Sequence, residues 1–416
     1  MRVAIIGAGA AGMMCAATLQ EHNPSAEIFL IDRNDGMGKK VIISGGGRCN
    51  VTTGIHDIKT VLKKYPRGEK FLTSAMYAFP PESVYAWFEL YGVPLKTQED
   101  ARVFPASDDG KDIVRVFEKK FAESNVKVLL KTPVTSVEKR GDEFLVNFKD
   151  AALPLVVDAL VLTTGGQAYR QTGSTGDGYA FAVSLGHTIT PLAPSLNAFF
   201  TNETWPARIS GLSLPSAKIT AKCEKQPTFT GPMLFTHKGI SGPAVFALSS
   251  LVAFETYHQK QPLSITIDLF PEESFDSLHA DLTELARLHP HKLFENILCK
   301  GMPSKLAEIA LEEMGIARTK IAQEISKKEG NRMCNWMKNI PLTVIQRGAG
   351  DEFVTAGGVT LSEVDPRTME SRICPRLFFA GEILDVDGFT GGFNLQASWA
   401  AGHLVGTSLK DAILDI

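Results

Sequence analysis

The chain has 416 residues, of which 44% are hydrophobic and 21% charged, with a formal net charge of −3. This length is too great for one ordinary core, so we expect a globular protein of two domains. The near-neutral charge without blocks of like sign argues against a nucleic-acid-binding surface. A membrane span would need an apolar run of about 18 residues, and the sequence has none. We therefore expect a cytoplasmic protein without a nucleic-acid or membrane partner.

The N-terminal sequence has the order strand, tight turn, helix, strand and acid. Residues 3–12 (VAIIGAGAAG) combine an apolar run with three glycines and lead into a helix-compatible segment, 13–20. A second apolar run, 27–31, ends at Asp32, which lies 20 residues after Gly12 (32 − 12). This spacing is typical of a dinucleotide-binding βαβ unit.

Each residue of the unit has a physical task. Gly7 permits the turn, Gly9 lets the backbone approach a pyrophosphate, and Gly12 lets the helix pack closely on the strand. The helix N-terminus offers unpaired N–H groups to the phosphates. Asp32 can accept hydrogen bonds from a ribose diol and repels a 2′-phosphate, which disfavours NADP in this site.

Strand and helix signals alternate up to about residue 50, and the chain is then mainly helical to about 123. Short β-runs fill 126–158, and the apolar run 159–164 predicts a buried parallel strand that ends at Gly165 and Gly166.

The stretch 173–178 (GSTGDG) opens a further helix-compatible segment. It follows a predicted strand so closely that we expect ligand contact, with Asp177 as one contact. The alternative is an ordinary helix start at which Asp177 is the cap.

The pattern of residue types changes near residue 191. Residues 191–270 have β-like runs and 272–330 look helical, whereas the C-terminal part returns to strand and helix. We therefore expect a discontinuous nucleotide-binding domain, 1–190 and 351–416, that is interrupted by an inserted domain, 191–350.

Glycine signals at the N-terminus, in the middle and at the C-terminus favour FAD over a nicotinamide cofactor, because a long ligand across the sheet needs all three. In the C-terminal signal, residues 377–402, a strand ends at Gly381 and Glu382, and Gly391 and Gly392 open a helix. A helix start near a flavin pyrimidine would stabilise negative charge on the reduced ring.

Several long motifs carry a family resemblance: GKKVIISGGGRCNVTT (38–53), LFTHKGISGPA (234–244), TAGGV (355–359) and the C-terminal signal. They resemble a bacterial Rossmann-fold flavoprotein family that includes enzymes described as aminoacetone oxidases and a bile-acid dienone reductase. The resemblance spans essentially the whole chain. It implies an α/β fold: a Rossmann-like FAD-binding domain of the glutathione-reductase or fumarate-reductase type, interrupted by an inserted β-barrel and helical domain.

The resemblance also implies where FAD would bind. The ADP half would lie on Gly7, Gly9, Gly12 and Asp32, and the adenine side on Gly166 and Asp177. The pyrophosphate and flavin would lie along Lys40, Ser44, Gly45, Arg48, Cys49 and Asn50. The ribityl chain and isoalloxazine would face Gly381, Glu382, Gly392, Asn394 and Leu395. The remaining expected cofactor-binding residues are Ala10, Ala11, Arg33, Val134, Thr164, Gly165 and Phe393.

Three residues are candidates for the chemistry itself. Arg48 offers a forked, permanent cation to a substrate anion or carbonyl, or alternatively to the phosphates of FAD. Asn50 could hydrogen-bond a flavin carbonyl or simply close a turn. His237 could donate a proton near pH 7 or serve as a structural hydrogen-bond partner.

Redox thiols and metals are not expected. The six cysteines are scattered and form no CxxC pair. Cys49 has no neighbour for a disulfide and is expected to be a packing residue. His289 and His291 form an HxH pair that no further ligand completes, so we expect no metal.

These features predict an FAD-dependent oxidoreductase that acts on a small organic substrate where the FAD and inserted domains meet. Two mechanisms stay open: a reductase fed by NADH or NADPH, and an amine-type oxidase. The alternatives are a non-catalytic flavin-bound redox sensor and a tRNA-modifying flavoprotein. The sequence predicts neither the substrate nor the oligomeric state.

Overall fold

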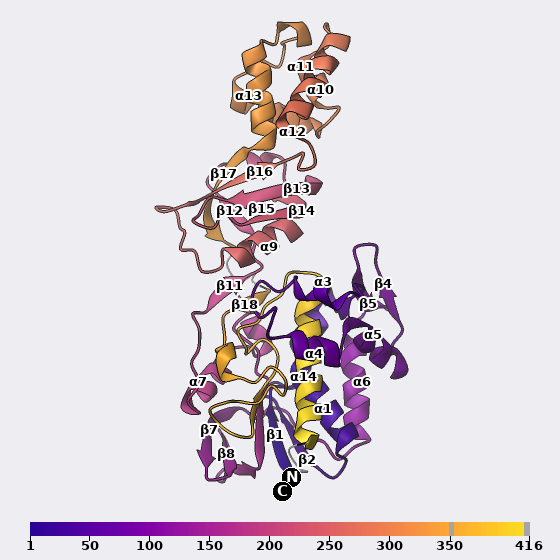
Figure 1. Cartoon of the computed structure of the whole chain (residues 1–416), viewed down its shortest axis with the longest axis vertical. Helices are drawn as coiled ribbons and strands as arrows, with labels where there is room; N and C mark the ends of the chain where they lie inside the picture. Colours follow the sequence, from indigo (N-terminus) through magenta and orange to yellow (C-terminus); the bar gives the residue numbers. More distant parts are fainter. Residues whose placement is uncertain (349–352, 412–416) are drawn as a thin grey trace. The chain divides into compact units, whose positions relative to one another are not determined.

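The structure is a computed structural model that describes residues 1–348 and 353–411. It divides into two compact units (Figure 1): unit 1 comprises 1–195 and 352–416, and unit 2 comprises 196–351. Each unit has its own hydrophobic core. The domain boundaries expected from the sequence lie a few residues before these.

A five-stranded sheet forms the centre of unit 1, in the order β19-β10-β1-β2-β6. Its strands are β1 (Arg2–Ile6), β2 (Glu27–Ile31), β6 (Lys127–Leu129), β10 (Ala159–Leu162) and β19 (Leu377–Phe379). All neighbouring strands pair in parallel, so their carboxyl ends share one edge of the sheet. β19 follows unit 2 in the sequence, so the C-terminal part of the chain completes the sheet.

Two helices from opposite ends of the chain pack side by side in unit 1 (Figure 1): α1 (Ala10–His22) and α14 (Phe393–Asp411). Glycines allow the close approach, because a Cβ at Gly402 would lie 2.3 Å from the carbonyl oxygen of Ala11. This contact brings the C-terminal helix to the N-terminal βαβ unit.

The remainder of unit 1 consists of short elements. Its other helices are α2 (Lys39–Ile43), α3 (Ile58–Leu62), α4 (Thr73–Ala78), α5 (Pro81–Leu90), α6 (Lys111–Ala122) and α7 (Asp177–Ser184). Single 3-10 turns cover Ser44–Gly47, Arg170–Thr172 and Leu361–Glu363. Unit 1 also has three minor sheets. The first contains β3 (Thr52–Thr53), β5 (Arg102–Pro105) and β4 (Leu95–Thr97), and the second contains β7 (Val134–Arg140), β8 (Glu143–Phe148) and β9 (Leu155–Val157). The third is the pair β11 (Ala193–Ser195) and β18 (Val354–Ala356).

The sequence analysis missed the sheet β3-β5-β4, which lies in the part of the chain expected to be mainly helical. These strands have only two to four residues. Runs this short carry no clear alternation, and their pairing partners, not their own propensity, make them strands.

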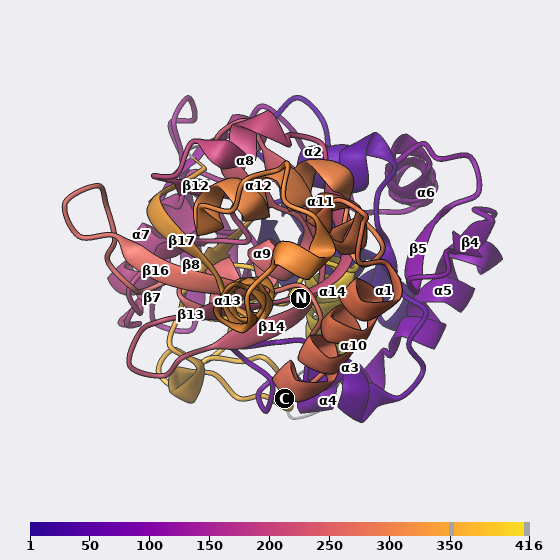
Figure 2. The same ribbon diagram turned by 90° about the horizontal axis from the view of Figure 1, so that it is seen from above.

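Unit 2 is built on a closed six-stranded barrel, in the order β12-β15-β14-β13-β16-β17. The strands are β12 (Phe199–Thr201), β13 (Ser213–Ala221), β14 (Thr228–Thr236), β15 (Gly239–Ser241), β16 (Leu263–Asp268) and β17 (Ile340–Arg347). Buried residues alternate with exposed or half-buried residues along β16, as a barrel wall requires. Two helices accompany the barrel: α8 (Trp205–Arg208) and α9 (Pro243–Leu251), of which α9 packs against β13 and β14 (Figure 2).

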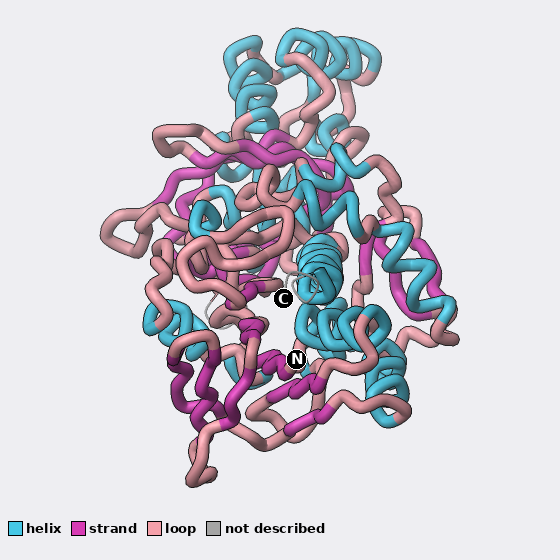
Figure 3. The backbone as a smooth tube through the Cα atoms, turned by 60° about the horizontal axis from the view of Figure 1, so that its bottom comes forward, coloured by secondary structure: helices cyan, strands magenta, loops and turns pink. Residues whose placement is uncertain are grey.

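A group of helices follows β16 and precedes β17 in the sequence. Helices are cyan in Figure 3. The group contains α10 (Phe275–Leu288), α11 (Phe294–Leu298), α12 (Ser304–Met314), a 3-10 turn (Ala322–Glu324) and α13 (Lys327–Lys338). Ser274 caps α10, and Ser326 forms a capping box with Glu329 at α13. The expected α/β fold with an inserted β-barrel and helices is confirmed.

A half-buried histidine makes the stability of unit 1 depend on pH. His403 of α14 stacks on Phe79 at 4.3 Å between ring centroids, and its Nδ1 lies 3.2 Å from the hydroxyl of Thr18. Burial, helped by the charge of His22, lowers the pKa of His403 from 6.5 to about 4. Because the pKa of His403 is lower in the folded than in the unfolded state, protonation of this ring favours unfolding. The contribution of His403 to stability is therefore complete above about pH 6.5 and is lost as the pH falls towards 4.

We expect His403→Gln to remove this pH dependence. Between pH 7 and pH 4.5 the wild-type protein should lose about 2 kcal/mol more stability than the variant, a figure reduced for the partial exposure of the ring. Denaturant unfolding at both pH values measures the difference. The matched variant His291→Gln, which changes an exposed histidine of unit 2, should keep the wild-type pH dependence.

Candidate cofactor-binding site

The three glycines of the N-terminal turn have different surroundings. Gly7 has φ +109°, and a Cβ there would lie 2.4 Å from the carbonyl oxygen of Thr163. A Cβ at Gly12 would lie 1.9 Å from the carbonyl oxygen of Gly7, so both positions require glycine for packing. Gly9, which caps α1 with extended dihedrals, would place a Cβ with no atom of the chain within 4 Å. The backbone therefore offers an open approach at Gly9.

Asp32 lies at the end of β2, beside this turn. One carboxylate oxygen accepts a hydrogen bond from the N–H of Ala8 (2.8 Å), and the other accepts one from the N–H of Asn34 (2.8 Å). Asp32 thus holds the glycine turn, and each oxygen keeps a lone pair that can accept from a ribose hydroxyl.

Arg33 joins β2 to the start of α7. Its guanidinium donates to Asp177 Oδ2 (3.0 Å) and to the hydroxyl of Thr175 (2.7 Å). The N-cap of α7 is Gly176, in a left-handed conformation, and Asp177 is the first helical residue. The alternative that Asp177 is the cap is therefore wrong, because the glycine takes the dihedral angles that the turn requires.

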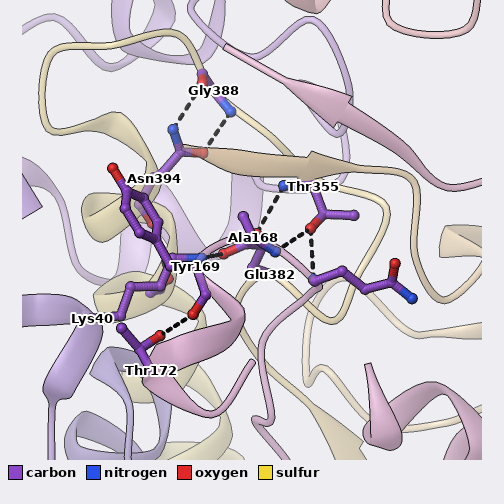
Figure 4. A network of polar contacts seen from close by, with 10 residues as sticks. Lys40, Ala168, Tyr169, Thr172, Thr355, Glu382, Gly388 and Asn394 are labelled. Atoms are coloured by element: carbon purple, nitrogen blue, oxygen red, sulfur yellow. Dashed lines mark hydrogen bonds and ion pairs between the residues drawn. The ribbon is translucent and has the colours of Figure 1, made fainter. Parts of the chain in front are cut away.

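An ion pair connects α2 to the end of β19. Lys40 Nζ lies 2.5 Å from Glu382 Oε2, and Glu382 Oε1 accepts from the N–H of Thr355 (2.8 Å) in β18. The hydroxyl of Thr355 in turn accepts from the N–H groups of Gln167 and Ala168, so the backbone and side chain of this one residue connect three segments (Figure 4). Glu382 is thereby fixed from two sides.

The segment that follows α2 contains three consecutive left-handed glycines. Gly45, Gly46 and Gly47 have φ of 58°, 73° and 89°, and the last two would place a Cβ in open space. Ser44 begins this turn and its carbonyl accepts from the N–H of Cys49 (2.9 Å). Cys49 is fully buried, and burial raises the pKa of its thiol to about 12, as suits a packing residue and not a nucleophile.

Arg48 follows these glycines and is half-buried. Its guanidinium lies 4.0 Å from the ring centroid of Phe104, and its nearest carboxylate, Asp108, is 3.7 Å away. The ring orients the side chain, whereas the long ion pair leaves the donors of the guanidinium available. Arg48 can therefore engage an anion or a carbonyl group.

We expect Arg48→Ala to weaken FAD binding or turnover by at least about tenfold, the effect of losing a charge-assisted hydrogen bond. The matched control is Arg102→Ala, because Arg102 lies over the same ring at 5.5 Å but is paired with Asp100 at 2.7 Å. FAD titration and steady-state kinetics compare the two. Equal behaviour of both variants would remove Arg48 from the site.

Asn50 is engaged by the main chain. Its side-chain nitrogen donates to the carbonyl oxygens of Thr52 (3.1 Å) and Val103 (3.2 Å), and its side-chain oxygen accepts from the N–H of Gly392 (2.8 Å). A Cβ at Gly392 would lie 2.2 Å from the carbonyl oxygen of Thr52. These contacts favour the alternative in which Asn50 closes a turn. Through its bond to Gly392, Asn50 also positions the residue that precedes α14.

Asn394 closes the loop before α14. Its side chain both accepts from the N–H of Gly388 (2.8 Å) and donates to the carbonyl of Gly388 (2.8 Å), as Figure 4 shows. Its side chain is thus bound to its own loop, so contact of this amide with the flavin stays a prediction.

Other expected site residues are placed as follows. Val134 begins β7, and the hydroxyl of Thr164 is buried without a hydrogen-bond partner among the residues that the structure describes. His237 lies in unit 2, on the exposed turn between β14 and β15. The part of His237 in the chemistry stays a prediction, as do the individual cofactor contacts of the other residues.

The sequence analysis named no role for two polar residues of this region. Thr355 belongs to the TAGGV motif, and Arg67 belongs to no motif. Arg67 forms a two-pronged ion pair with the fully buried Asp387. No local pattern identifies such a pair, because its partners lie 320 residues apart.

The residues of unit 1 fit a dinucleotide. The open approach at Gly9 adjoins the first turn of the 13-residue helix α1, whose leading N–H groups have no intrahelical acceptor. Asp32 with its free lone pairs suits a ribose, and the cations Arg33 and Lys40 flank the same carboxyl edge of the sheet.

The HI0933-like protein Rossmann domain family matches residues 1–408. The chain belongs to this family. It is 29% identical over 413 residues to the 3-dehydro-bile acid delta(4,6)-reductase of Clostridium scindens, with 99% of each chain covered. It is 31% identical over 411 residues to the ribosomal RNA dihydrouridine synthase of Haemophilus influenzae, with 98% of each covered.

The fold is shared with a solved steroid dehydrogenase structure. The 3-ketosteroid delta1-dehydrogenase of Sterolibacterium denitrificans matches with a TM-score of 0.52 and 13% identity, and the match covers 99% of each chain. The expected membership of a Rossmann-type flavoprotein family is confirmed.

No group of three or more His, Cys, Asp or Glu side chains in 1–348 and 353–411 is arranged to hold a metal ion. Within the same ranges, no helix has the length and apolar character that spanning a bilayer requires.

Proposed function

We propose that this chain binds FAD and reduces a carbon–carbon double bond conjugated with a carbonyl group in a small organic substrate. The observation that carries this proposal is the full-length similarity to two kinds of reductive enzyme whose named reactions share one chemistry.

The two named reactions differ in substrate but not in bond type. Reduction of a 3-dehydro bile acid at Δ4 and Δ6 saturates double bonds conjugated with the 3-oxo group. Formation of dihydrouridine saturates the 5,6 double bond of uracil, which is conjugated with the 4-carbonyl. In both cases hydride adds to a carbon in conjugation with the carbonyl, and a proton completes the saturated product.

This chemistry needs few protein groups. Bound FAD in its reduced form would supply the hydride. The chain would hold the cofactor through Gly9, Asp32, Lys40 and Glu382. The cation of Arg48 can polarise the substrate carbonyl, and His237 is the proposed proton donor. We further propose NADH or NADPH as the source of electrons.

A second candidate substrate is a uridine in ribosomal RNA, which the name of the Haemophilus relative favours. The near-neutral net charge supports a small substrate instead. The expectation of no nucleic-acid partner thus stays a prediction, and that name speaks against it.

An anaerobic titration tests the electron donor and then the substrate. NADH or NADPH should bleach the visible absorbance of the FAD-loaded protein. Mixing the bleached protein with 4-androstene-3,17-dione, or with ribosomal RNA lacking dihydrouridine, then compares the two substrate classes. If the oxidised flavin spectrum returns only with RNA, the substrate is a uridine in RNA and the proposal of a small-molecule substrate is wrong. A flavin that neither nucleotide reduces, but an amine does, would indicate an oxidase.

A further inference from the structure

The segment from Glu382 to Gly392 connects the two C-terminal parts of the proposed FAD site. It starts at the end of β19 and finishes immediately before α14. In the described structure it contains only isolated bridges, among them Leu384 with Val359 and Asp387 with Arg67. Tertiary contacts must therefore set its shape.

A second segment, Lys64–Gly68, contacts residues 386–389 of this connection and the start of α14. The carbonyl of Lys64 accepts from the N–H of Phe389 (2.9 Å), and the hydroxyl of Tyr65 donates to the carbonyl of Phe393 (2.7 Å). A Cβ at Gly68 would lie 2.6 Å from a methyl group of Val386. The two segments fit closely.

The charged contact between the two segments is the buried pair Arg67–Asp387. Asp387 is 0% exposed, and both oxygens of its carboxylate accept from the guanidinium of Arg67, whose side chain is 16% exposed. A buried ion pair is weak evidence for stability, because desolvation offsets the attraction between the charges. Its fixed fork geometry is better suited to hold a segment in one position.

Asp387 also has a partner in the strand that leaves unit 1. The hydroxyl of Ser195, the last residue of β11, donates to Asp387 Oδ2 (2.8 Å) and is fully buried. β11 pairs with β18, where the N–H of Thr355 donates to Glu382. Both strands that connect the units are therefore bonded to acids of the Glu382–Gly392 segment.

We propose that Arg67, Asp387 and Ser195 are positioning residues that hold the Glu382–Gly392 segment in the shape that receives the flavin end of FAD. This inference rests on the proposed binding of FAD. The three residues act through the segment and need no contact with the cofactor. This role would explain why a polar cluster stands at a place where apolar packing could supply the same stability.

The test compares FAD binding with stability in Ser195→Ala and Arg67→Lys. The first removes one hydrogen bond to Asp387, and the second keeps the charge but loses the fork. Each should raise the dissociation constant of FAD about 3- to 10-fold and shift the visible spectrum of the bound flavin. Fluorescence titration of the FAD-free chain and absorbance of the loaded chain measure both effects.

The matched control is Ser371→Ala, since Ser371 is a buried serine of unit 1 whose hydroxyl lies 2.8 Å from His187 Nε2. It should lower the melting temperature but leave the affinity and spectrum of FAD unchanged. If Ser195→Ala and Arg67→Lys behave like this control, the positioning role is wrong. If the wild-type chain takes up no FAD, the proposed function and this inference both fail.

Discussion

Replacing Gly9 by valine should abolish the retention of FAD while leaving the protein folded. The dihedrals of Gly9 (φ −82°, ψ −167°) are accessible to any residue, and its Cβ would meet no atom of the chain within 4 Å. The new side chain would occupy the place proposed for the pyrophosphate. We expect the dissociation constant of FAD to rise about 100-fold or more, because overpacking at a tight contact costs several kcal/mol.

Two other glycines serve as controls for Gly9→Val. Gly330→Val also adds a side chain in open space, in α13 of unit 2, and should leave FAD binding intact. Gly12→Ala should instead destabilise the fold, because its Cβ would lie 1.9 Å from the carbonyl oxygen of Gly7. Absorbance of the purified proteins and their melting temperatures separate these outcomes. A yellow, fully loaded Gly9→Val protein would show that the pyrophosphate lies elsewhere.

Removing the carboxylate of Glu382 should have the second largest effect on FAD. Glu382→Ala would leave Lys40 without its partner at 2.5 Å and the N–H of Thr355 without its acceptor at 2.8 Å. Loss of these charge-assisted contacts, and of the proposed contact with FAD, should raise the dissociation constant of FAD about 10- to 100-fold. Fluorescence titration of the FAD-free protein gives this value directly.

Glu370→Ala is the matched control for Glu382→Ala. Glu370 also lies in unit 1, and its carboxylate accepts from the N–H of Arg376 (2.7 Å). Its removal should cost stability without changing the affinity for FAD. Equal affinities of the two variants would mean that Glu382 has a structural task only.

The sequence predicted the parts of this protein that local patterns encode. The order of Gly7, Gly9, Gly12 and Asp32 follows from the geometry of one βαβ unit, and the structure gives each glycine a distinct environment. The inserted barrel was expected from family resemblance, since alternation in its strands alone does not indicate closure.

Long-range polar contacts escaped the sequence analysis. Arg67 and Asp387 are 320 residues apart, and no spacing rule connects them. The ion pair between Arg33 and Asp177 likewise joins residues 144 positions apart. In both cases the outcome depends on which segments the fold brings together, which one-dimensional patterns do not contain.

The central claim is that the flavin of this protein reduces double bonds conjugated with a carbonyl. The most direct measurement is the anaerobic reoxidation of the photoreduced, FAD-loaded protein, which needs no nicotinamide. A panel of conjugated ketones is compared with the saturated ketone of each. We predict that the oxidised flavin spectrum returns only with conjugated members of the panel, with one double bond lost per flavin. A flavin that stays reduced with every conjugated ketone and with ribosomal RNA, yet is reoxidised by oxygen, would contradict the claim.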